Sequence, residues 1–139
     1  MTDVVALSNA FVAYWNRRDI EAILGALAPD VVYQNVPLSA LAGRDAVRAF
    51  ITPNLTRVTQ MHWVVHNVAV TADGNKVLTE RTDSFHFDGG VVHVPVRGIF
   101  EFRDGLIAAW RDYADIGDFV RQMGAIGQRP GWSSQTAAS

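Results

Sequence analysis

The sequence contains no cysteine. This absence excludes a disulfide framework, a thiolate zinc site and a cysteine nucleophile. The sequence also lacks any apolar run approaching the roughly 20 residues that cross a bilayer. Its first residues have no basic lead and do not resemble a signal peptide. We therefore expect a soluble protein of the cytoplasm that does not contact a membrane.

Charge is scarce as well. Charged residues make up 19 % of the 139 residues, against about 25 % in an average soluble domain. The 12 basic and 14 acidic side chains give a net charge of −2, so the basic excess of a nucleic-acid binder is missing. The 49 % apolar content argues against disorder. The length predicts a single domain at residues 1–130, followed by a loose polar tail at 131–139.

The chain divides into a helical part and a β-rich part. Apolar spacing predicts a helix over residues 3–18, a short second helix capped by Asp19, and a third from Gly43 through Ile51. A strand at 31–36 separates the second and third helices. Four β-type runs joined by glycine-containing turns then follow, at 61–72, 76–87, 91–103 and 106–114. A last short helix begins at Ile116 and ends near Met123.

Helices followed by a long antiparallel meander indicate an α+β domain. If its mixed or antiparallel sheet is strongly curved, the sheet wraps around the N-terminal helices and leaves an internal pocket. This arrangement resembles the cone of the nuclear transport factor 2-like superfold. A fold of this kind hosts many activities, so the function has to come from particular residues.

Three predicted strands carry polar pairs two residues apart, a spacing that places both side chains on one face. On the strand at 76–87, the shared face also carries the apolar residues Val77, Phe85 and Phe87. The same holds for the strand at 106–114. The pairs are Tyr33 and Asn35, Arg81 and Asp83, and Trp110 and Asp112.

One guanidinium and two carboxylates therefore fall on the apolar side of the sheet. Buried charge is costly unless it is paired, so Arg81, Asp83 and Asp112 should form one cluster. A structural ion pair between strands would explain these three residues by itself. Tyr33 and Asn35 favour a site instead, because a salt bridge does not need neutral hydrogen-bonding groups, whereas a bound water or substrate oxygen does.

In these motifs, over roughly residues 4–123, the sequence resembles the limonene-1,2-epoxide hydrolase family. The resemblance implies a homodimeric enzyme that adds water to an apolar, cyclic or terpene-like epoxide in one step, without a cofactor, to give a vicinal diol. It implies that Asp112 is the general base and that Tyr33 and Asn35 hold the attacking water. It further implies that Asp83 is the general acid and that Arg81 bridges the two carboxyls.

The residue chemistry is compatible with these roles. Epoxide opening needs a proton for the leaving oxygen and an activated water, and two carboxyls in opposite protonation states supply both. Burial and a second carboxylate raise the pKa of the acid, whereas Arg81 opposes this rise for the carboxyl that it contacts more closely. The two carboxyls should titrate as a pair.

Strand parity also predicts the substrate-binding wall. Phe85 follows Asp83 by two residues and should line the pocket. The full predicted set is Trp110, Phe85, Val94, Val96 and Leu38. No metal or cofactor site is expected, since His62 and His66 would be spread by about 13 Å along a strand and the glycine-rich turns are not followed by helices.

Two other functions remain open. A ketosteroid isomerase-like or polyketide cyclase-like enzyme would also use Asp and Tyr in an apolar cavity, although Arg81 would weaken its base. A non-catalytic ligand-binding domain would not require the charged cluster. On the outer face of the sheet, an apolar set predicts a homodimer: Val91, Ile99, Ile107 and Tyr113.

Overall fold

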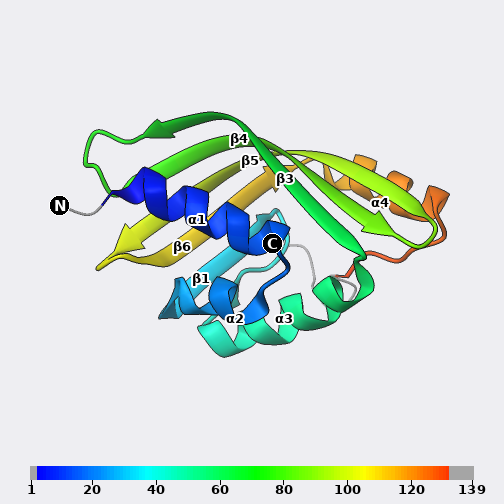
Figure 1. Ribbon diagram of the computed structural model, residues 1–139, viewed down its shortest axis with the longest axis horizontal. Helices are drawn as coiled ribbons and strands as arrows, with labels where there is room; N and C mark the ends of the chain where they lie inside the picture. The colour runs from blue at the N-terminus through cyan, green and yellow to red at the C-terminus, as the bar shows by residue number, and fades with distance from the viewer. Residues whose placement is uncertain (1–2, 132–139) are drawn as a thin grey trace.

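The computed structural model describes residues 3–131 (Figure 1). Its elements are α1 (Val4–Asn16), α2 (Ile20–Gly25), β1 (Leu27–Val36), β2 (Leu41–Ala42), α3 (Arg44–Arg57), β3 (Gln60–Val70), β4 (Lys76–Phe87), β5 (Gly90–Arg103), β6 (Leu106–Ala114) and α4 (Ile116–Ala125). This order confirms the predicted α+β class. Within the described range, no helix is long and apolar enough to cross a membrane.

The six strands form one mixed sheet in the order β2-β1-β6-β5-β4-β3. Every neighbouring pair is antiparallel except β1 and β6, which run parallel. Strand β6, which follows the other five strands in the sequence, therefore lies between β5 and β1. Figure 1 shows α1 lying across one face of the sheet, with α2 and α3 beyond β1.

Local sequence signals explain where the helices begin. The carboxylates of Asp3, Asp19 and Asp115 each accept a hydrogen bond from the backbone N–H three residues later, at the starts of α1, α2 and α4. Such caps satisfy backbone donors that have no partner within the helix. The predicted cap at Asp19 is thus confirmed.

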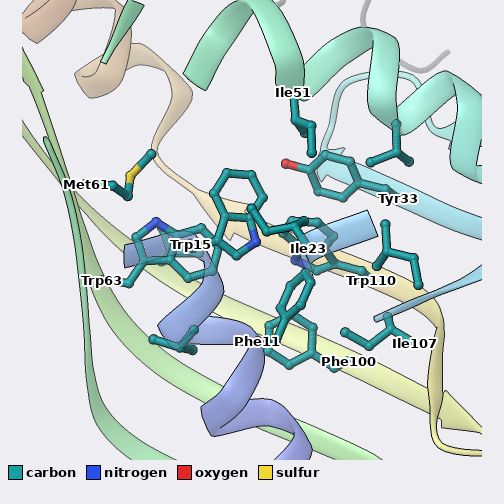
Figure 2. Close-up of a cluster of buried hydrophobic side chains, with 14 of the residues drawn as sticks. Phe11, Trp15, Ile23, Tyr33, Ile51, Met61, Trp63, Phe100, Ile107 and Trp110 are labelled. Atoms are coloured by element: carbon teal, nitrogen blue, oxygen red, sulfur yellow. The ribbon is translucent and has the colours of Figure 1, made fainter. Parts of the chain in front are cut away.

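Aromatic side chains fasten α1 to the sheet (Figure 2). The ring of Phe11 meets those of Phe100 and Trp110 edge-on, with centroids 5.3 Å and 5.2 Å apart. One turn further along the helix, Trp15 stacks on Trp63 of β3 at 4.8 Å. Edge-to-face and offset-stacked pairs stabilise such contacts beyond their buried area. Helix α1 is therefore held over the inner face of β3, β5 and β6.

Several element boundaries differ from the prediction. Strand β1 begins at Leu27, four residues early, and its pairing with β6 shifts between Leu27 and Val32. Pro29 lies in this irregular stretch, where a residue without an N–H is tolerated. The two-residue strand β2 was not predicted. Helix α3, predicted from Gly43 through Ile51 with a kink or another turn at Pro53, continues as one helix through Pro53 to Arg57.

The prediction for Ile107 was wrong. This residue was expected on the outer face, yet it is 1 % exposed and belongs to the core. Strand β6 has an extra residue where Ile107 pairs with Phe102 and Ala109 pairs with Glu101. A bulge of this kind reverses the parity of every residue beyond it. Of the remaining outer set, Val91 and Tyr113 are exposed and Ile99 is half-buried.

The predicted tail at 131–139 falls almost entirely outside the described residues. Only Gly131 is described, and it lies against Asn54 of α3 so closely that a side chain at position 131 would overlap the Asn54 amide.

Candidate active site

The sheet register brings the three polar pairs together. Strand β1 runs parallel to β6, with Tyr33 opposite Trp110 and Asn35 opposite Asp112. On the other side of β6, Asp112 lies opposite Gly98 of β5, and Gly98 lies opposite Thr79 of β4. Since Arg81 and Asp83 follow Thr79 on the same face, the polar residues of three strands converge across Gly98.

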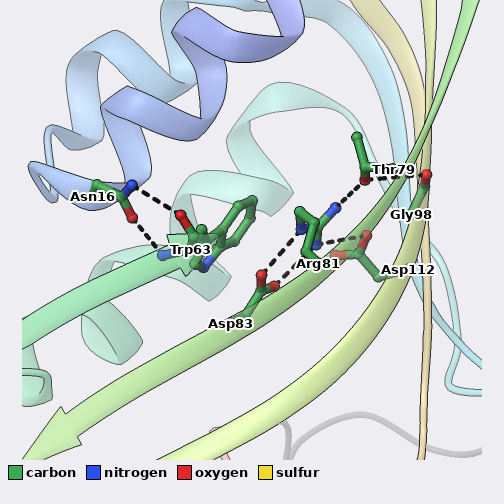
Figure 3. Close-up of polar contacts among 7 residues, drawn as sticks. All are labelled: Asn16, Trp63, Thr79, Arg81, Asp83, Gly98 and Asp112. Atoms are coloured by element: carbon green, nitrogen blue, oxygen red, sulfur yellow. Dashed lines mark hydrogen bonds and ion pairs between the residues drawn. The ribbon is translucent and has the colours of Figure 1, made fainter. Parts of the chain in front are cut away.

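Arg81 bridges the two carboxyl groups (Figure 3). Its Nε and Nη2 donate to the two oxygens of Asp83, both at 3.0 Å, and Nη2 also donates to Oδ1 of Asp112 at 3.2 Å. The contact with Asp83 is bidentate, whereas only one oxygen of Asp112 is engaged. The second oxygen of Asp112 receives no hydrogen bond from the residues described, so it can accept one from a water.

The cluster is deeply buried. Arg81 is 1 %, Asp83 3 % and Asp112 7 % exposed. Trp63 covers the guanidinium, with Cζ of Arg81 4.4 Å from its ring centroid. The backbone N–H and C=O of Trp63 are in turn hydrogen-bonded to the Asn16 side chain. Through these hydrogen bonds α1 holds Trp63 in place, and the Trp63 ring shields the charged residues from water.

Thr79 and Gly98 also lie next to the Arg81 guanidinium. Nη1 of Arg81 donates to Oγ1 of Thr79 at 2.9 Å. A methyl group built on Gly98 would lie 2.5 Å from Nη1 and closer still to Oδ1 of Asp112. Because Gly98 has no side chain, the Arg81 guanidinium has room to contact the Asp112 carboxylate beside it.

Burial sets the electrostatics of the cluster. Loss of solvent raises the pKa of Asp83 from 3.8 to about 6, although the charge and hydrogen bonds of Arg81 act to lower it, and the nearby Asp112 charge adds to the rise. Burial alone would lower the pKa of Arg81, but the charges of Asp112 and Asp83 outweigh it and raise that pKa. Arg81 thus stays cationic, while Asp83 can carry a proton near neutral pH.

Tyr33 and Asn35 flank Asp112. The Tyr33 ring stacks on Trp110 at 4.0 Å, which fixes its plane. Burial, followed by the Asp112 charge, raises the pKa of the Tyr33 hydroxyl, while a hydrogen bond with the Asn35 side chain opposes this rise. The hydroxyl therefore stays protonated and can donate or accept a hydrogen bond.

A cavity of about 130 Å³ opens onto these groups. Its lining includes Tyr33, Asn35, Asp83 and Asp112 and the predicted wall residues Phe85, Val94 and Val96. Leu38 and Trp110 are buried but are not among the lining residues. Trp110 instead lies behind Tyr33, and no acceptor for its indole N–H is found within residues 3–131.

Three residues of the site were missed at the level of sequence: Trp63, Thr79 and Gly98. Thr79 precedes Arg81 by two residues on the face already identified, so strand parity could have found it. A glycine within a strand marks a close approach of neighbouring groups, which was a usable signal for Gly98. Trp63 could not be placed over Arg81 without knowing how β3 pairs with β4.

Comparison with known proteins identifies relatives of the chain. Residues 2–124 match the family model of the limonene-1,2-epoxide hydrolase catalytic domain. The epoxide hydrolase EphG of Mycobacterium tuberculosis is 34 % identical over 115 residues, which cover 83 % of this chain and 75 % of the relative.

Solved structures agree with this relationship. A structure of an LEH-like epoxide hydrolase from M. tuberculosis superposes with a TM-score of 0.74 at 32 % identity, covering 86 % of this chain and 88 % of the other. An NTF2-like protein of unknown function from Burkholderia pseudomallei has a TM-score of 0.76 at 21 % identity over 87 % of this chain and 97 % of the other, which shows the fold alone. By its sequence match over most of its length, the chain belongs to the limonene-1,2-epoxide hydrolase family.

Proposed function

We propose that this protein hydrolyses an apolar epoxide to a vicinal diol in one step, without a cofactor. The observation that carries the proposal is the position of Arg81, which bridges two buried carboxyl groups at the wall of an apolar cavity. The two carboxyls differ in the way that acid–base catalysis requires. Asp83 has a raised pKa, and Asp112 keeps one oxygen free of hydrogen bonds from the described residues.

In the proposed reaction, a water hydrogen-bonded to Asp112, Tyr33 and Asn35 attacks a carbon of the oxirane. Asp112 takes the water proton as the new C–O bond forms. The ring C–O bond breaks, and Asp83 gives its proton to the leaving oxygen. The site then holds one protonated and one ionised carboxyl, as before, with their identities exchanged. One proton transfer from Asp112 to Asp83 restores the starting state.

The remaining groups position this pair. Arg81 keeps the carboxyls within reach of one oxirane and offsets part of their negative charge, which lessens the cost of burying two acids together. In the proposed complex the substrate lies against the apolar lining residues Val94, Val96 and Phe85. Exclusion of bulk water strengthens each of the hydrogen bonds that act on the reacting atoms.

An oxygen-18 experiment under single-turnover conditions tests the proposal. Enzyme in excess is mixed with cyclohexene oxide in H₂¹⁸O, and the diol and the protein are analysed by mass spectrometry. Direct attack by water places the label in the diol during the first turnover. An unlabelled first diol, with label retained in an Asp carboxyl, would establish a covalent ester and refute the one-step reaction. No hydrolysis of any cyclic or terpene epoxide would refute the activity.

Two copies associate through the outer face of the sheet. The exposed apolar side chains Val64, Val91 and Tyr113 lie on the outer face of β3, β5 and β6, and such a surface tends to be covered by a partner. Light scattering coupled to size exclusion should give the mass of a dimer. Tyr113→Arg should shift this mass towards that of the monomer, and a monomeric wild-type protein would contradict the association.

A further inference from the structure

One cationic side chain lines the cavity outside the charged cluster. Arg57, the last residue of α3, belongs to the lining. Its Nη1 donates to the carbonyl oxygen of Arg129 at 2.9 Å, and its Nη2 donates to Oδ1 of Asn54 at 3.3 Å. Both partners are neutral, and among the residues described Arg57 forms no ion pair. Its positive charge is therefore not matched by a carboxylate of residues 3–131.

The orientation of Arg57 is fixed by its neighbours. Its Cζ lies 5.9 Å from the ring centroid of Phe87, which also lines the cavity. Asn54 is itself held by a hydrogen bond from its Nδ2 to the carbonyl oxygen of Phe50, at 2.7 Å. Although Arg57 is exposed, its contacts with Phe87, Asn54 and Arg129 hold the guanidinium beside the cavity, which lowers the conformational cost of binding a ligand there.

Strand β4 gives the separation between the charged cluster and Phe87, the residue whose ring Arg57 contacts. Phe87 follows Asp83 by four residues on the same face, and a strand rises by about 3.3 Å per residue, so the two lie about 13 Å apart. The cavity wall beside this stretch of β4 is apolar, with Phe85, Val94 and Phe119. The cavity therefore combines an acid–base site, an apolar wall and a cation at a distance from that site.

We propose that the substrate is an epoxide carrying an anionic group, such as a carboxylate, at the end of an apolar chain, and that Arg57 binds this group. The inference rests on the proposed epoxide hydrolysis and adds the class of substrate. Guanidinium suits this role because its donors match the geometry of a carboxylate and its charge is retained at every relevant pH. Three bonds of an extended chain span about 3.3–3.6 Å, so a separation of about 13 Å corresponds to roughly ten chain atoms.

A purely structural role for Arg57 makes a different prediction. A cation at the end of a helix interacts favourably with the helix dipole, and the bond to Arg129 ties α3 to the segment that follows α4 (Figure 1). If Arg57 did only this, its loss would lower stability and would reduce the hydrolysis of charged and neutral epoxides by the same factor. The ratio of kcat/KM for a charged epoxide to that for a neutral one therefore distinguishes ligand binding by Arg57 from a purely structural role.

The experiment compares a straight-chain fatty acid that has a terminal oxirane about ten carbons from its carboxylate with the methyl ester of the same acid. We expect the wild-type enzyme to prefer the acid by about tenfold in kcat/KM, mainly through KM, as a charge-assisted hydrogen bond would give. Arg57→Gln should bring the ratio close to one, and Arg57→Lys should retain part of the preference. The matched control is Arg97→Gln, since Arg97 is exposed on β5 and pairs with Glu80 away from the cavity; it should keep the wild-type ratio.

Each other outcome has a defined meaning. Equal kcat/KM for acid and ester in the wild-type enzyme, together with turnover of cyclohexene oxide, would overturn the role of Arg57 and leave the proposed hydrolysis intact. A preference that persists in Arg57→Gln would also overturn it. If none of the three epoxides is hydrolysed, the proposed function fails and this inference fails with it. The wild-type comparison decides the matter even if Arg57→Gln does not fold.

Discussion

Gly98 on β5 lies directly opposite Asp112 on β6, and the space that a side chain at Gly98 would fill is occupied by the Asp112 carboxylate and the Arg81 guanidinium. The glycine is required by this contact and not by its backbone, because it lies within a strand and lacks a positive φ. The contact between Arg81 and Asp112 thus depends on a residue that has no side-chain functional group.

Gly98→Ala should therefore impair both activity and stability. Overpacking a full interior costs about 1–3 kcal/mol, and a displacement of catalytic groups by about 1 Å can lower the rate by about 100-fold. Thermal unfolding and kcat/KM for cyclohexene oxide measure the two effects. Gly124→Ala is the matched control, because no atom lies within 4 Å of a Cβ added at Gly124 in α4. Full activity in Gly98→Ala would show that the cluster is not essential.

Substitution of either carboxyl should nearly abolish hydrolysis. Asp112→Asn removes the proposed base and Asp83→Asn removes the proposed acid, and each role contributes about 10²–10⁴-fold to the rate. Steady-state kinetics with purified variants tests this, with circular dichroism to confirm folding. Asp88→Asn, at an exposed acid in the turn between β4 and β5, should retain the wild-type rate. Retention of activity by both active-site variants would refute the assignment.

The raised pKa of Asp83 predicts a decline of activity in alkaline solution. The acid must be protonated in the free enzyme, and burial raises its pKa to about 6. We expect kcat/KM to fall by about tenfold per pH unit above this value, because this parameter reports ionisations of the free enzyme. A pH profile between about pH 5 and 9 tests the expectation. A kcat/KM that rises through this range would exclude Asp83 as the acid.

The same group should make stability depend on pH. In the folded protein Asp83 retains its proton up to about pH 6, whereas its unperturbed pKa is 3.8. The stabilising contribution is therefore complete below the unfolded pKa and is lost as the pH rises through the folded one. The free energy of unfolding of the wild-type protein, relative to Asp83→Asn, should decrease between about pH 4 and 6. Urea titrations at several pH values measure the difference, and a relative increase would contradict the buried, protonated acid.

Tyr33→Phe removes the Tyr33 hydroxyl but keeps the packing of the ring, so it tests the two separately. The phenyl ring can keep the stacking on Trp110 at 4.0 Å, while the hydroxyl that is proposed to hold the water is lost. We expect kcat to fall by about 10–100-fold, as loss of one hydrogen bond to the reacting water implies, with the melting temperature little changed. Tyr113→Phe, on the exposed outer face, serves as the control. An unchanged kcat in Tyr33→Phe would remove Tyr33 from the proposed mechanism.

Strand parity was sufficient to predict that Arg81, Asp83 and Asp112 are buried together, because a residue two positions away on a regular strand shares the same face. It failed at Ile107, where a bulge in β6 changes that face. The placement of Trp110 and Leu38 away from the cavity lining, and of Trp63 over Arg81, depends on packing between elements. Such packing depends on many contacts at once, and no short motif in a single sequence predicts it.

The parallel pairing of β1 with β6 has a consequence for how the enzyme becomes active during synthesis. The strand that bears Tyr33 and Asn35 is synthesised before β4 and β5, while its neighbour in the sheet, which bears Asp112, is synthesised after them. Arg81 and Asp83 are made between the two. A nascent chain therefore contains Arg81 and Asp83 before it contains Asp112, and under the proposed mechanism hydrolysis of an epoxide reports that β6 has inserted beside β1.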